Sequence, residues 1–158
     1  MSTGHGKKVS IMIGSDHGGF EYKKEIIGLL KDKEIDVEDV GNFTKESSDY
    51  PDLAVKVAEA VSEGKADKGI LVCGSGIGMS IVANKFPGVR AALVHNVETA
   101  KLSRLHNNAN ILILGERVSD PRILPEILNV WLGTEFEGGR HQRRLDKITT
   151  LEKKLYKK

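Results

Sequence analysis

The sequence is poor in cysteine, in aromatic residues and in long apolar runs, and each shortage excludes a class of protein. Cys73 is the one cysteine among 158 residues, so the chain can form no internal disulfide and no cysteine metal cage. Aromatic residues make up 5% of the chain, which argues against a protein that stacks nucleic-acid bases. The longest strictly apolar runs are four residues, as at Ile111–Leu114, so we expect no membrane-spanning segment.

Neither sign of charge dominates the chain. It has 24 Lys and Arg residues against 22 Asp and Glu residues, a formal net charge of +2, which gives no overall attraction to nucleic acid or to an anionic membrane. The first eight residues, Met1–Lys8, are polar and lack the apolar core of a secretory signal, so we expect a cytoplasmic protein. The length fits one domain over residues 1–158, which can bury a core without metals or disulfides.

Short β-rich runs alternate with longer helical patterns along the chain. Strands are predicted at 9–13, 35–40, 69–73, 90–94 and 110–114, and helices at 20–33, 51–63, 79–85, 98–106, 121–132 and from 140 onward. This alternation predicts a three-layer, doubly wound α/β sandwich of the Rossmann or flavodoxin type, with a five-stranded parallel sheet. In such sheets, ligands bind at the carboxyl ends of the strands.

A glycine-rich loop, Cys73-Gly-Ser-Gly-Ile-Gly78, follows the third predicted strand. Its alternating glycines let successive backbone N–H groups point into one concavity at a helix start, which favours anion binding. The loop fits neither the dinucleotide fingerprint, which needs Gly or Ala where Met79 stands, nor the phosphate loop, which needs a Lys-Ser/Thr pair. Cys73 itself is either a core residue or a thiolate base favoured by the helix start, and its position leaves both interpretations open.

Histidines and an aspartate provide further candidates for chemistry. Asp16 and His17 follow the first predicted strand, either as a turn with a helix cap or as a clamp for a hydroxylated, anionic ligand. His95 follows the fourth strand and His106 precedes the fifth, and we expect one of the two to be an exposed surface residue. His106 is the better placed of the two to move protons near neutral pH.

The last predicted helix is basic and carries an apolar stripe. Arg140 and Arg144 lie one turn apart and share a face, so they predict either a solvated helix or a phosphate clamp. The stripe is suited to pack on a partner subunit, and its members are Leu145, Ile148, Leu151 and Leu155.

Eight short motifs, in order from about residue 8 to 150, together resemble one family, the ribose-5-phosphate isomerase B family, which includes the galactose-6-phosphate isomerase subunits. The motifs are Gly14–Phe20, Asp49–Pro51, Cys73–Gly78, Ala83–Lys85, Arg104–Asn107, Gly115–Val118, Trp131–Gly133 and Phe136–Gln142.

The resemblance implies an enzyme that interconverts ribose 5-phosphate and ribulose 5-phosphate through an enediolate, without metal or cofactor. Family members are homodimers or dimers of dimers whose active sites lie between subunits. The resemblance assigns Cys73 as the base that moves a proton between C1 and C2; another branch uses a glutamate where this chain has Met79. It assigns His106 to opening the sugar ring, with Ser75 assisting at the enediolate.

The resemblance also implies a set of substrate-binding residues. They contact the sugar, hold the enediolate or grip the phosphate, partly across the interface, and they are Asp16, His17, Gly74, Ser75, Gly76, Ile77, Gly78, Asn107, Arg117, Arg140 and Arg144. The role of His141, beside the phosphate grip, stays open.

Three alternatives remain at this point. The first is a family member that acts on a six-carbon sugar phosphate, such as allose or galactose 6-phosphate. The second is a flavodoxin-like module that binds a flavin or nucleotide phosphate without catalysis, although such a module has no need for Cys73. The third, an interaction protein with a basic tail, is least favoured because the net charge is only +2.

Overall fold

A five-stranded parallel sheet forms the centre of the computed structural model, which describes residues 10–157. The strand order is β2-β1-β3-β5-β4. The strands are β1 (Ile11–Ser15), β2 (Val37–Asp39), β3 (Lys68–Cys73), β4 (Ala91–Leu93) and β5 (Ile111–Gly115). The predicted fold class is confirmed. Val9, predicted to begin the first strand, and the segment Met1–Lys8 lie outside the described residues.

The helices follow the predicted order. They are α1 (Phe20–Asp32), α2 (Tyr50–Ser62), α3 (Ile77–Ala83), α4 (Val97–Leu105), α5 (Leu124–Gly133) and α6 (Arg140–Leu155), with 3₁₀ turns η1 (His17–Gly19) and η2 (Pro121–Ile123). Helical structure begins at Pro121 as predicted, with Asp120 as its cap, but its first turn is the 3₁₀ turn η2 and the α-helix α5 begins only at Leu124. Pro125 explains the difference: a proline fits the first turn of a helix, whereas deeper inside it would clash with a carbonyl four residues back.

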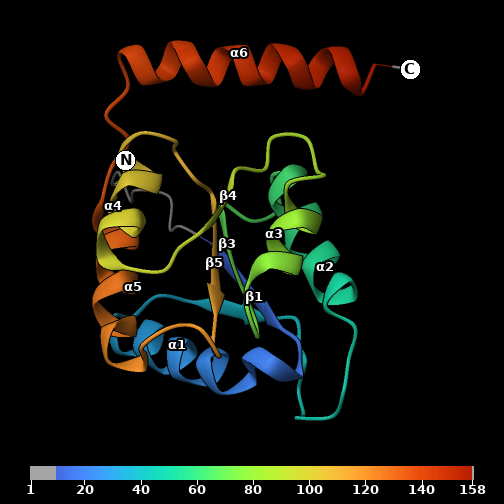
Figure 1. Ribbon diagram of the computed structural model, residues 1–158, viewed down its shortest axis with the longest axis vertical. Coiled ribbons are helices and arrows are strands. Elements are labelled where there is room, and N and C mark those ends of the chain that lie inside the picture. The colour runs from blue at the N-terminus through green and yellow to red at the C-terminus, as the bar shows by residue number, and fades with distance from the viewer. Residues whose placement is uncertain (1–9, 158) are drawn as a thin grey trace, which may run out of the picture.

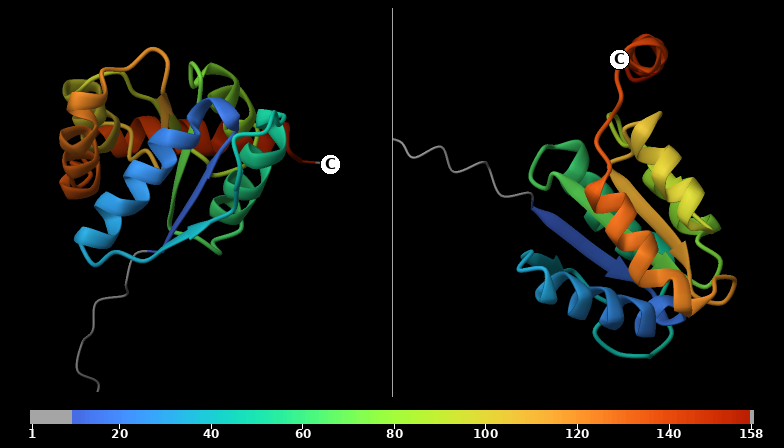
Figure 2. Two further views of the ribbon diagram at one scale, coloured as in Figure 1. Left: turned by 90° about the horizontal axis from the view of Figure 1, so that it is seen from below. Right: turned by 90° about the vertical axis from the view of Figure 1, so that its left-hand side faces the viewer.

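Helices cover both faces of the sheet, which gives three layers (Figure 2). On one face α1, α4 and α5 bury a cluster around Ile26, Leu114 and Trp131. On the other face α2 and α3 bury a cluster around Val57 and Met79. The central strands β3 and β5 are apolar almost throughout because they are covered on both sides.

Helix α6 stands apart from these layers. It lies across the amino ends of the strands, at the end of the molecule opposite the carboxyl ends (Figure 1). His141 and Leu145 are its buried residues, and most of its other side chains are exposed. Within residues 10–157, no helix is both long and apolar enough to cross a membrane.

Candidate active site

A pocket of about 330 Å³ opens at the carboxyl ends of β1, β3 and β5, where the fold class predicts a ligand site. We call it the cysteine pocket. Its lining residues come from four separate segments of the chain and are Asp16, Tyr50, Cys73, Gly74, Ser75, Gly78, Arg117 and Val118.

Cys73 lies at the base of this pocket as the last residue of β3, and it is 5% exposed. Its sulfur accepts a hydrogen bond from the amide of Gly76 at 3.1 Å, so the positive end of a backbone dipole stabilises negative charge on the sulfur. Gly76 adopts φ +80°, and a Cβ there would lie 2.5 Å from Cδ1 of Leu93. The loop therefore needs glycine at this position, both for the backbone conformation and for the close packing.

The other loop residues divide between the pocket and the surface. The hydroxyl of Ser75 accepts a hydrogen bond from the amide of Ile77 at 3.2 Å, which fixes the serine at the start of α3. The side chain of Ile77 is 55% exposed and points away from the core. A Cβ on Gly78 would lie 2.5 Å from Cζ of Tyr50, so the tyrosine ring packs directly against this glycine.

Arg117 brings a positive charge to the pocket. Its amide donates to the carbonyl of Gly74 at 2.9 Å, and its side chain lies 3.2 Å from the point that a Cβ on Gly74 would occupy. The guanidinium group thus lies over the glycine-rich loop, where it can attract an anion.

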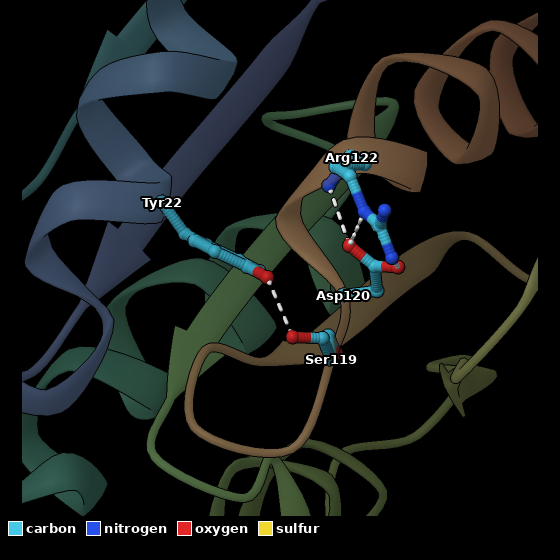
Figure 3. A network of polar contacts seen from close by, with 4 residues as sticks. All are labelled: Tyr22, Ser119, Asp120 and Arg122. Carbon is cyan, nitrogen blue, oxygen red and sulfur yellow. Dashed lines mark hydrogen bonds and ion pairs between the residues drawn. The ribbon is translucent and has the colours of Figure 1, made fainter.

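The segment that carries Arg117 is held at its base by Tyr22 of α1. The amide of Tyr22 donates to Oε1 of Glu116 at 2.6 Å, and its hydroxyl donates to the carbonyl of Ser119 at 3.2 Å (Figure 3). Burial and then the charge of Glu116 raise the pKa of Tyr22, so the hydroxyl stays protonated as the donor. Beyond it, Asp120 accepts from the amide of Arg122 and pairs with its guanidinium, which closes the segment at η2.

Backbone amides fix both Asp16, which lines the pocket, and His17, which follows it in the chain. Oδ1 of Asp16, which is 7% exposed, accepts from the amide of Gly18 at 2.9 Å. Nδ1 of His17 accepts from the amide of Ser48 at 3.2 Å. Because Nδ1 accepts, the proton of the neutral ring is on Nε2, and His17 can donate a hydrogen bond to a ligand.

Lys23 supports the segment that holds His17, and sequence reasoning missed it. Its side chain is 1% exposed, and its ammonium group lies 2.9 Å from Oδ1 of Asp39 and donates to the carbonyl of Asn42. One signal was present, because Lys23 precedes Ile26 by three residues and Leu30 by seven, which places it on the buried face of α1.

Tyr50 and Val118 are further pocket residues that sequence reasoning did not single out, although both lie inside motifs that carry the family resemblance.

The remaining predicted site residues lie at the amino ends of the strands, opposite the cysteine pocket. Helix α4 runs back against the strands, so His106 and Asn107 follow it at the amino end of β5, which is about 13 Å long. Arg140 and Arg144 are exposed on α6 at the same edge. Within one chain the structure therefore does not bring these four residues to Cys73.

His106 stacks on His141 at this edge. The ring centroids are 4.2 Å apart, the planes differ by 14°, and Oε2 of Glu137 lies 3.9 Å from Nε2 of each ring. Two histidines and a carboxylate can suit a metal ion, but an imidazole lone pair lies in the plane of its ring, and the stacked rings hold their lone pairs in two separate, nearly parallel planes. In this arrangement the pair does not converge on one ion.

His95, the other histidine considered, is exposed in the turn after β4, in agreement with the expectation for one of the two.

A second pocket of about 460 Å³ runs between α6 and the amino edge of the sheet. The predicted apolar stripe of α6 lines it: Leu145 is buried, while Ile148, Leu151 and Leu155 are 47%, 53% and 68% exposed. Asn107 also lines this pocket.

Comparisons with known proteins point to one family. The family model described as Ribose/Galactose Isomerase matches residues 11–148. The ribose-5-phosphate isomerase B of Escherichia coli is 45% identical over 144 residues, covering 91% of this chain and 97% of its own.

Solved structures agree with the sequence comparisons. The ribose-5-phosphate isomerase B of Clostridium thermocellum superimposes with a TM-score of 0.90 at 52% identity, covering 93% of this chain and 99% of its own. The enzyme of Mycoplasma genitalium with bound ribulose-5-phosphate gives 0.87 at 46% identity, covering 92% and 97%. The chain thus belongs to the ribose-5-phosphate isomerase B family, and it is an isomerase rather than a non-catalytic binding module.

Proposed function

We propose that the protein interconverts ribose 5-phosphate and ribulose 5-phosphate through an enediolate, with Cys73 as the base. The observation that carries the proposal is the cysteine pocket, which groups a sulfur, a glycine-rich loop and the Arg117 guanidinium at one strand edge. Aldose–ketose isomerisation needs a base over one carbon and donors for the oxygen that gains charge. The cysteine pocket offers both.

The chemistry is a balanced transfer of protons within the substrate. The Cys73 thiolate takes the proton from C2 of the open-chain aldose, and the C–H electron pair forms the C1–C2 double bond of the enediolate. The thiol returns the proton to C1, and a proton passes from O2 to O1 as the C2 carbonyl forms. Ser75 and the loop amides stabilise the enediolate. The substrate as a whole is neither oxidised nor reduced, so the reaction requires no redox cofactor.

The substrate assignment rests on the relatives. The Escherichia coli relative is named for ribose 5-phosphate, and the Mycoplasma genitalium structure holds ribulose-5-phosphate. We assign Asp16 and the Nε2–H of His17 to the sugar hydroxyls, since Asp16 lines the pocket, His17 is the next residue, and backbone amides fix both side chains. A six-carbon sugar phosphate is the competing substrate, because the family also includes galactose isomerases.

We further propose that the working enzyme is a homodimer, or a dimer of dimers, with sites shared between subunits. The partner would supply four groups to the cysteine pocket: His106 to open the sugar ring, Asn107 to bind the sugar, and Arg140 and Arg144 to join Arg117 at the phosphate. Two facts support this. These groups lie at the opposite strand edge from Cys73 within one chain, and the exposed apolar stripe of α6 offers a surface that a second subunit can cover.

The test is a coupled assay of the purified protein on ribose 5-phosphate, allose 6-phosphate and galactose 6-phosphate, each with and without a chelator. We expect kcat/KM for ribose 5-phosphate to exceed that for either six-carbon sugar by about tenfold or more, since an extra carbon must fit the same pocket. The chelator should leave the rate unchanged. A higher kcat/KM for a six-carbon sugar would reassign the substrate.

A further inference from the structure

The stacked pair His106–His141 joins two segments that are 35 residues apart in the sequence. The amide of Glu137 donates to the carbonyl of Leu105 at 3.0 Å, which ties the segment before α6 to the last turn of α4. This backbone bond brings the two rings into register, with their centroids 4.2 Å apart. A backbone hydrogen bond between the two segments therefore fixes the position of the stack.

The two rings differ sharply in exposure. The side chain of His141 is 6% exposed and that of His106 is 34% exposed. Nε2 of His141 is buried and has no hydrogen-bond partner among the described residues. An unsatisfied buried nitrogen costs free energy, so packing, and not hydrogen bonding at this atom, accounts for the contact of the His141 ring with His106. His141 thus offers a fixed flat surface, while His106 keeps one face for a ligand.

The charges around the pair favour a neutral His141. Burial lowers its pKa, and the nearby cations His106, Arg140 and Arg144 lower it further, while Glu137 acts in the opposite direction. These groups come from the end of α4, the segment before α6 and α6 itself. A neutral His141 ring places no net charge against the His106 imidazole that is stacked on it.

We propose that His141 is a positioning residue for His106: its buried ring holds the His106 imidazole in the orientation that opens the cyclic sugar. The inference rests on the proposed function, in which His106 performs ring opening. It assigns no direct contact with substrate to His141.

Hydrogen exchange with solvent separates ring opening from the rest of catalysis. Ribose 5-phosphate is mostly a furanose and must be opened, whereas ribulose 5-phosphate is open-chain because its O5 carries the phosphate. Formation of the enediolate from ribulose 5-phosphate lets its C1 hydrogen exchange with solvent deuterium through the Cys73 thiol, without any ring step. Because the equilibrium constant fixes the ratio of kcat/KM in the two directions, a defect in ring opening lowers net conversion in both directions together and spares this exchange.

The experiment measures net conversion of ribose 5-phosphate and deuterium exchange at C1 of ribulose 5-phosphate for His141→Ala and His141→Phe, with His95→Ala as the control for loss of an exposed histidine. We expect His141→Ala to lower kcat/KM for ribose 5-phosphate by about tenfold or more, because misplaced catalytic groups lose rate steeply. Its rate of deuterium exchange, followed by NMR in D2O, should change by less than about threefold. His141→Phe keeps a flat ring and should restore the ribose 5-phosphate rate to within about threefold of wild type.

Several outcomes would overturn the inference. Equal losses of net conversion and of deuterium exchange for a folded His141→Ala protein would indicate a general structural role, and no loss of either would indicate no role. If His141→Phe is as impaired as His141→Ala, a ring nitrogen acts directly and the stack does not explain the effect. A wild-type protein that does not act on ribose 5-phosphate at all would instead contradict the proposed function.

Discussion

The sulfur of Cys73 lies 3.1 Å from the amide nitrogen of Gly76, three residues further along the loop. The hydrogen bond turns the side chain of Cys73 toward the start of α3, where backbone dipoles also stabilise negative charge. A serine in place of Cys73 would keep the shape of this arrangement and lose the acidity of the thiol.

Cys73→Ser is therefore expected to remove isomerisation while ribose 5-phosphate still binds. A serine hydroxyl is far less acidic than a thiol, so it cannot act as the base near neutral pH, and turnover should fall by about 10²–10⁴-fold. The coupled assay gives turnover, and isothermal titration calorimetry gives binding. More than about a tenth of wild-type turnover in the variant would mean that Cys73 is not the base.

The arginines of α6 can be tested against a neighbour on the same helix. Arg140→Ala and Arg144→Ala should each weaken binding of the phosphorylated sugar by about 1.5–3 kcal/mol, the range for a lost hydrogen bond to a charged group. Arg143→Ala, also exposed on α6, is the matched control and should bind like wild type. The measurement is KM for ribose 5-phosphate beside any trace rate on unphosphorylated ribose. Equal losses on both sugars would point to folding or assembly instead.

A shared site predicts complementation between two inactive chains. A heterodimer of a Cys73→Ser chain and an Arg140→Ala/Arg144→Ala chain would contain one site with both lesions and one site with neither. Co-expression, with a different tag on each chain, should thus restore up to about half of the per-site activity in the purified heterodimer. If the heterodimer forms, as native mass spectrometry would show, and stays inactive, Cys73 and the arginines do not meet across an interface.

The sequence predicted the sheet and the cysteine pocket well, because both follow from local patterns. Apolar runs locate β3 and β5, and the order of strands and helices brings Cys73, Asp16 and Arg117 to one strand edge. It could not place His106 relative to Cys73, since that depends on the direction in which α4 runs against the sheet.

Lys23 escaped sequence analysis for a different reason. A buried lysine is tolerated only because Asp39 and the carbonyl of Asn42 surround its ammonium group, and these partners come from a segment 16 to 19 residues away. The sequence of α1 alone therefore does not indicate that Lys23 has these partners.

Replacing Lys23 should destabilise the fold more than replacing its neighbour. Lys23→Met removes the ammonium donor from the Asn42 carbonyl and from the Asp39 carboxylate, which keeps the Gly41 amide as a donor, and this should lower the free energy of unfolding by about 1–3 kcal/mol. Lys24→Met changes an exposed lysine on the same helix and should have little effect. Urea unfolding of both variants makes the comparison, and matching midpoints would show that the buried contact contributes nothing.

His141 predicts a loss of stability on acidification. Its pKa in the folded protein lies below the ordinary value of 6.5, so as the pH falls through 6.5 the unfolded chain takes up a proton that the folded chain does not. The free energy of unfolding should therefore fall as the pH drops below this value. His141→Phe removes this contribution, and its stability should depend less on pH between about pH 7 and pH 5. Urea unfolding across this range tests it, and parallel curves for the two proteins would contradict it.

The outermost strands of the sheet, β2 and β4, are only three residues long. A short edge exposes few unpaired backbone groups, so one copy of the sheet cannot readily extend another into a fibre. The proposed association between copies would then depend on side chains rather than on backbone hydrogen bonds between sheets. Single substitutions on helix surfaces can consequently change the affinity between copies without altering the sheet that holds the cysteine pocket.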